Sequence, residues 1–118
     1  MAKTKYYIGD RLVRTSERTY THAVMRGDRL ASCCGSLALA EKEATRLKNA
    51  ARESINFSVR CLEASLAGKP RVTYTARSGN RRWTETREIT KTPDYYMSRI
   101  NYWTEELNGI RVVALEAR

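Results

Sequence analysis

The sequence has little of the residues on which metal, disulfide and many catalytic sites depend. Among its 118 residues are one histidine, His22, and three cysteines, Cys33, Cys34 and Cys61. An odd number of cysteines with two adjacent fits neither a disulfide framework nor the paired ligand spacing of a zinc site. No glycine-rich loop that could hold a phosphate is present. We therefore expect reduced thiols, no metal and no cofactor.

Long apolar runs are also missing. No stretch approaches the roughly 18 apolar residues that a membrane-spanning helix needs, and the first ten residues, MAKTKYYIGD, lack the apolar segment of a secretory signal. We expect no membrane association and a cytoplasmic location. Because no low-complexity linker interrupts a chain of 118 residues that is 42% hydrophobic, we expect a single domain over residues 1–118.

Basic residues are abundant, and they are unevenly placed. The formal net charge is +9, which favours phosphates or acidic protein surfaces as partners. Residues 69–91 hold seven basic and two acidic side chains, and residues 1–35 hold seven and three. The segments 36–68 and 92–118 are close to neutral. The excess charge therefore lies on the segments that we expect to form strands.

Turn signals and alternation predict the strands of the N-terminal part. Gly9-Asp10 and Gly27-Asp28 each stand between residues that favour strands, and Gly-Asp suits a two-residue hairpin loop. With a third turn at 15–18, residues 4–35 are predicted to form an antiparallel meander. Its middle strand would be RTYTHAVM, which is rich in β-branched and aromatic residues.

Periodicity predicts a long helix over residues 36–67. Steps of three and four put one set of residues on a single face: Ala40, Ala44, Leu47, Ala51, Ile55, Ser58, Leu62 and Leu66. Ser36 suits the N-cap, and Gly68 followed by Pro70 ends the helix. Such a helix would be about 48 Å long. Either it bends near 54–58, or its end is covered by a second copy; we expect a homodimer through helix 36–67.

The remainder of the chain completes an α+β fold with an antiparallel sheet. RVTYTAR and RWTETREI alternate, so residues 71–89 are predicted to form a hairpin with a loop in ARSGNRRW. Thr92-Pro93 opens a second helix that ends at Gly109. IRVVALEA is predicted to close the chain as a largely buried strand. On the hairpin, Trp83 is expected to join the apolar face.

The basic hairpin is the predicted binding site for nucleic acid or an acidic partner. Its contact residues are predicted to be Lys69, Arg71, Arg77, Arg81, Arg82 and Arg87. A two-stranded ribbon fits the major groove of DNA, and an arginine can donate paired hydrogen bonds to a phosphate. The alternative is that the same charges only keep an exposed edge from aggregating. Both interpretations stay open at this point.

Catalysis is not expected. Counting back from the Gly27-Asp28 loop places His22 opposite Cys33, and a histidine beside a cysteine can activate a thiol. However, no third group in the sequence is placed to orient His22. Cysteine is also commonly a small buried apolar residue, and a register shift of one residue would separate the pair. We therefore expect a binding protein and not an enzyme.

The segment RTYTHAVMRGDRLASCCGSLALAEKEA, residues 18–44, resembles the strand, hairpin and alanine-rich helix of small uncharacterised proteins of bacteriophages. The resemblance covers the N-terminal half and assigns no residue roles. It implies an accessory protein made in the host cytoplasm, of a kind that often acts by binding. The two functions to weigh are a nucleic-acid-binding module and an inhibitor of a host defence nuclease, such as an anti-CRISPR protein.

Overall fold

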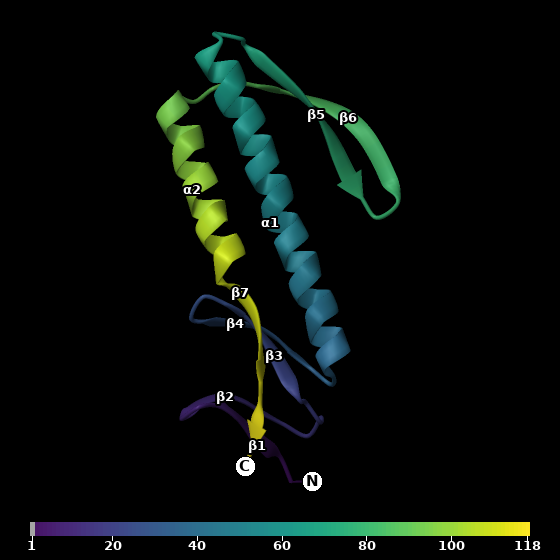
Figure 1. The fold of residues 1–118 in the computed structure, drawn as a ribbon. Helices are drawn as coiled ribbons and strands as arrows, with labels where there is room; N and C mark the ends of the chain where they lie inside the picture. The colour runs from purple at the N-terminus through teal and green to yellow at the C-terminus, as the bar shows by residue number, and fades with distance from the viewer. Residues whose placement is uncertain (1) are drawn as a thin grey trace. The chain divides into compact units, whose positions relative to one another are not determined.

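The computed structural model describes residues 2–118. Two helices and eight strands form within them, and all strand pairs are antiparallel. The predicted α+β class is therefore confirmed. In chain order the elements are β1 (Thr4–Ile8), β2 (Arg11–Ser16), β3 (His22–Arg26), β4 (Arg29–Cys34), α1 (Leu37–Leu66), β5 (Arg71–Ser78), β6 (Arg81–Glu88), α2 (Pro93–Gly109), β7 (Ile110–Ala114) and β8 (Glu116–Ala117) (Figure 1).

The contacts of the chain gather into two compact units. Unit one comprises the residues through Ala50 together with Glu106–Arg118, and unit two comprises Ala51–Glu105. The divisions fall inside α1 and near the end of α2, so each helix contributes to both units. A single domain over residues 1–118 stays a prediction. Neither helix within residues 2–118 is long and apolar enough to cross a membrane.

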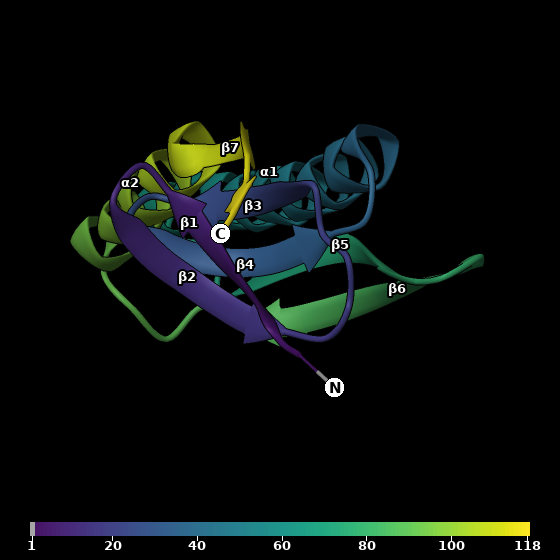
Figure 2. The same cartoon turned by 90° about the horizontal axis from the view of Figure 1, so that it is seen from below.

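Unit one holds two three-stranded sheets, ordered β2-β1-β8 and β4-β3-β7. The predicted meander is thus divided between two sheets, because β2 pairs only with β1 while β3 lies between β4 and β7. Figure 2 shows the β1–β2 hairpin in front of the β3–β4 hairpin. The chain changes sheets once more at Leu115, whose N–H donates to the Thr21 carbonyl at 2.9 Å.

The predicted two-residue loops of these hairpins are confirmed. Gly9 and Gly27 have φ of 59° and 61°, which places the left-handed residue first, as a type II′ turn requires. Tyr6 holds the connection between the hairpins: its hydroxyl donates to the Arg18 carbonyl at 2.7 Å and accepts from the Tyr20 N–H at 3.2 Å. The two hairpins are therefore joined by hydrogen bonds as well as by the chain.

The core of unit one packs the beginning of α1 against the second sheet. Val24, Ala40, Ala44 and Ile110 are buried together, and Val24 has no exposed surface. Filling such a site with apolar carbon contributes about 1.5–3 kcal/mol for a valine-sized side chain. The expected strand 110–117 forms as β7 and β8, but only Ile110 in it is buried. The prediction of a largely buried strand is wrong, because short edge strands have one side open to solvent.

The core of unit two packs the later part of α1 against α2 and the β5–β6 hairpin. Cys61, Ala64, Val72 and Tyr96 are buried together. The predicted stripe on α1 holds in register at Ala51 and Ser58, but Leu66 is 69% exposed. Because one turn of an α-helix takes 3.6 residues, steps of three and four do not follow one face over the whole helix. Near its end the buried face has shifted to Cys61 and Ala64.

Both ends of α1 form as the sequence predicts. The Leu39 N–H donates to the Ser36 hydroxyl at 3.2 Å, which is an N-cap. At the other end the Lys69 N–H donates to the Ala64 carbonyl at 2.9 Å, and Gly68 has a φ of 69°, as in a Schellman motif. The helix is continuous through 54–58. The homodimer through helix 36–67 stays a prediction.

Candidate nucleic-acid interface

The β5–β6 hairpin places the predicted basic residues in a defined register. Arg71–Ser78 and Arg81–Glu88 pair without interruption, so the loop is Gly79-Asn80, inside the predicted turn ARSGNRRW. Gly79 has a φ of 60°, again the first position of a type II′ turn. The loop end of the hairpin extends away from the helix beside it, as Figure 1 shows.

The register assigns the hairpin side chains to two faces, because opposite residues in an antiparallel pair point to the same side. The helix-side face includes Val72, which is buried in the core of unit two. The other face is named here the threonine face. It consists of Arg71, Thr73, Thr75, Arg77, Arg82, Thr84, Thr86 and Glu88, and all eight residues are exposed.

The threonine face carries hydroxyl groups in its middle and arginines toward the loop. The Thr73 and Thr86 hydroxyls lie 3.2 Å apart, and Thr75 is opposite Thr84. Beyond them Arg77 stands directly opposite Arg82. Threonine hydroxyls and arginine guanidinium groups are among the groups that bind phosphate oxygens. The predicted contact residues did not include these threonines, although the T-x-T pattern in each strand is a usable signal for them.

The arginines at the loop end have no acidic partner. Within residues 2–118, the side chains of Arg77, Arg81 and Arg82 make no hydrogen bond and no ion pair. The nearest carboxylate along β6, Glu85, accepts from the Tyr74 hydroxyl at 2.5 Å and from the Trp83 indole N–H at 2.6 Å. These hydrogen bonds, that from Tyr74 above all, hold the pKa of Glu85 below its ordinary value.

The remaining predicted contact residues lie closer to the helices, and all are exposed. Arg71 is opposite Glu88 at the base of the hairpin. Arg87 is on the helix-side face, with its guanidinium carbon 5.9 Å from the centroids of the Phe57 and Tyr74 rings. Lys69 precedes β5. The register thus brings Arg77 and Arg82 together on one face and separates Arg87 from them.

An open groove of about 500 Å³ in unit two adds one cation that the predicted contact residues did not include. Arg60, Lys69 and Arg71 line it together with Glu63. Arg60 comes from α1, and its guanidinium donates to the Thr73 carbonyl at 3.2 Å on the open edge of β5. No local sequence signal indicates this contact, because only the packing of α1 on the hairpin creates it.

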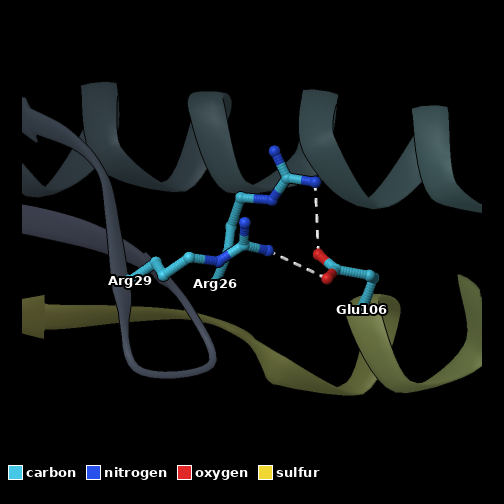
Figure 3. A network of polar contacts seen from close by, with 3 residues as sticks. All are labelled: Arg26, Arg29 and Glu106. Atoms are coloured by element: carbon cyan, nitrogen blue, oxygen red, sulfur yellow. Dashed lines mark hydrogen bonds and ion pairs between the residues drawn. The ribbon is translucent and has the colours of Figure 1, made fainter. Parts of the chain in front are cut away.

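The β3–β4 loop of unit one carries arginines in a different environment. Arg26 and Arg29 flank the loop, and both donate to the Glu106 carboxylate, at 3.2 and 3.0 Å (Figure 3). The Glu106 side chain is only 14% exposed. Arg111 further donates to the Gly27 carbonyl at 2.7 Å. The arginines at this loop therefore have their partners within unit one.

Trp83 departs from the prediction that it joins the apolar face. It is 41% exposed, whereas Val72 on the same face is 9% exposed. The reason is position: Trp83 lies opposite Ala76, near the loop and beyond the buried part of the hairpin. The strand tyrosines of unit one lie deeper, with Tyr6 at 3%. Trp83 is thus the exposed strand aromatic among the basic residues of the hairpin.

The predicted pairing of His22 with Cys33 is wrong. A β-bulge between Val24 and Met25 shifts the register, so His22 is opposite Cys34 and Ala23 is opposite Cys33. Burial raises the pKa of the Cys33 thiol despite the nearby Arg14. A thiol with a raised pKa holds less of the reactive thiolate at neutral pH. The geometry gives this pair no nucleophile and base arrangement.

Other ligand-bearing groups are dispersed. Within residues 2–118 there is no group of three or more His, Cys, Asp or Glu side chains that could hold a metal ion, and the three cysteines are free. No family model, no curated protein and no solved structure matches the chain. The resemblance of residues 18–44 to bacteriophage proteins stays a prediction.

Proposed function

We propose that the protein binds nucleic acid without catalysing a reaction on it, and that the β5–β6 hairpin is the contact surface. Arg77, Arg81 and Arg82 bind phosphates at the loop end, and the threonine hydroxyls bind neighbouring phosphate oxygens. Lys69 and Arg71 extend the positive surface toward the groove that Arg60 lines. Arg87 adds charge from the helix-side face.

The observation that carries this proposal is the pairing of Arg77 with Arg82. Like charges directly opposite each other destabilise an antiparallel pair, and an exposed edge can be protected from aggregation by a single charge. A pair of facing arginines that forms no ion pair within residues 2–118 leaves donors free for an anion. A polyanion carries negative charges along a line, as the hairpin carries positive ones.

The test is a mobility shift with the triple variant Arg77→Ala, Arg81→Ala and Arg82→Ala. Single-stranded and duplex DNA and RNA are each used at low and moderate salt. The wild-type protein is expected to bind and to weaken steeply with salt, because phosphate contacts release counterions. Removal of three phosphate-binding side chains is expected to weaken binding on the order of 10-fold to 100-fold at moderate salt.

A matched variant controls for net charge. Lys3→Ala, Lys5→Ala and Lys42→Ala removes three exposed positive charges from unit one. It is expected to weaken binding less than about 3-fold, since long-range attraction alone is screened by salt. Equal losses in the two variants would contradict a site on the hairpin. No shift of wild-type protein with any nucleic acid would contradict the function.

A second candidate function is inhibition of a host defence nuclease through protein–protein binding. It is favoured by a row on α2 in which Tyr95 and Tyr102 are 45% and 43% exposed, with the Arg99 guanidinium carbon 4.9 Å from the Tyr102 ring centroid. Tyrosine and arginine are enriched at the energetic centres of protein interfaces.

The two candidates are separated by capture from a bacterial lysate with and without nuclease treatment. Under the inhibitor hypothesis a protein is retained after nuclease treatment, and Tyr95→Ala with Tyr102→Ala releases it. Under the nucleic-acid hypothesis the captured material disappears with nuclease treatment. The triple arginine variant then captures little.

A further inference from the structure

Trp83 has features that the phosphate contacts do not explain. Its indole is 41% exposed, although leaving the apolar surface of a tryptophan in water is unfavourable in free energy. The residue opposite Trp83 is Ala76, whose side chain is only a methyl group. Arg81, two residues earlier, points to the same face and is exposed. One side of the hairpin near the loop therefore presents an indole beside a guanidinium group.

The indole is also held in place. Its N–H donates to one oxygen of Glu85 at 2.6 Å, and the Tyr74 hydroxyl donates to the other oxygen at 2.5 Å. Tyr74 in turn packs against Phe57, with ring centroids 4.6 Å apart. The chain of contacts runs from the edge of the core to the exposed ring. An aromatic surface that is fixed before binding loses less side-chain entropy when a ligand stacks on it.

We propose that Trp83 is a stacking platform for an unpaired nucleobase, so that the ligand of the hairpin is a single-stranded nucleic acid. This inference rests on the proposed function. Arg81 binds a phosphate next to the stacked base on the helix-side face. Arg77 and Arg82, on the threonine face, bind the strand where it continues around the loop end of the hairpin.

The choice of a single strand follows from what each nucleic acid exposes. Bases of a duplex are stacked on their neighbours, so their faces are closed to a protein ring unless the helix is opened. Single-strand binders combine a basic surface with exposed aromatic rings on which bases stack. The hairpin offers both within a few residues of its loop.

The experiment uses fluorescence of the full chain with Trp103→Phe, so that Trp83 is its sole tryptophan. The probes are oligothymidine of about 12 nucleotides, within the span that small single-strand sites cover, and a blunt duplex of similar charge. Quenching of Trp83 fluorescence by oligothymidine and little change with the duplex are expected. Titration of Trp83→Ala by anisotropy is expected to show about 10-fold weaker oligothymidine binding and under about 2-fold change for duplex.

Trp83→Phe separates stacking from a structural effect, because it keeps an aromatic face and loses the hydrogen bond to Glu85. It is expected to retain most of the affinity for oligothymidine that Trp83→Ala loses. Unchanged oligothymidine binding by Trp83→Ala would overturn the stacking platform, and if the triple arginine variant still weakened binding the proposed function would stand. Failure of the wild-type protein to bind either probe would overturn both.

Discussion

Two hairpin loops of this protein carry arginines on both sides, and they use them differently. At the β3–β4 loop, Arg26 and Arg29 converge on Glu106, which is largely buried. At the β5–β6 loop, Arg77 faces Arg82, and no carboxylate of residues 2–118 forms an ion pair with either. Both loops begin with a glycine at positive φ, at 61° and 60°. The backbone is therefore alike, and the difference lies in what the rest of the chain supplies.

The partner of the first loop comes from far away in the sequence. Glu106 is 80 residues from Arg26, and the Gly27 N–H donates to the Gly109 carbonyl at 2.9 Å. A Cβ atom on residue 109 would lie 3.0 Å from the Gly27 nitrogen, so a larger residue than glycine there would have to push the loop backbone away by a few tenths of an ångström. The first loop is a structural contact of unit one, whereas the second leaves its cations to solvent. A cluster of arginines therefore indicates a binding site only where no acidic side chain of the protein neutralises it.

Removing the counter-charge of the first loop should have the largest effect on stability. Glu106→Ala leaves Arg26 without its carboxylate while Arg26 Nε is already buried without a hydrogen-bond partner. We expect a loss of about 2 kcal/mol in the free energy of unfolding, most of it from Arg26 because Arg29 is 69% exposed. Urea denaturation measures this loss. A loss below about 0.5 kcal/mol would show that the arginines of the first loop depend on an acidic partner as little as those of the second.

Supplying a counter-charge to the second loop should have a smaller and opposite effect. Arg77→Glu places a carboxylate opposite Arg82 and is expected to raise the free energy of unfolding by about 0.2–1 kcal/mol, while nucleic-acid binding falls. Arg71→Glu is the matched control, since it changes the charge equally but faces Glu88. It should lower stability by a similar amount. The same sign of change in both variants would contradict the register argument.

The smallest effect concerns the acid that lies closest to the second loop. Hydrogen bonds from Tyr74, and secondarily from Trp83, lower the pKa of Glu85. Its contribution to stability is therefore present above the unfolded-state pKa and is lost as the pH falls through the folded-state pKa. Tyr74→Phe should raise the Glu85 pKa toward the ordinary value. Carboxyl NMR titration checks this, and an unchanged pKa would mean that Glu85 is not held by Tyr74.

Local signals in the sequence were sufficient for much of the fold. The segment ARSGNRRW indicated the β5–β6 turn, and the two-residue loop found within it fixes which residues share the threonine face. Ser36 and Gly68 indicated the ends of α1, because caps depend on nearby residues.

What the sequence could not predict depends on contacts between distant segments. The bulge after Val24 moved His22 from Cys33 to Cys34. The strand opposite ends in the small residues Ala-Ser-Cys-Cys, which do not alternate clearly enough to reveal the extra residue. Nothing near Arg26 in the sequence points to Glu106. The exposure of Trp83 depends on how far the helices cover the hairpin, and the alternation of residues along a strand does not indicate this.

The most direct test of the free arginines at the second loop is the salt dependence of nucleic-acid binding. The logarithm of the association constant for oligothymidine is plotted against the logarithm of the salt concentration. For the triple variant of Arg77, Arg81 and Arg82 the slope should be smaller than that of the wild type by about 2, or roughly 0.7 for each phosphate that is no longer neutralised. The triple lysine control should keep the wild-type slope. An identical slope for the wild type and the arginine variant would contradict the account, because those arginines would then release no counterions.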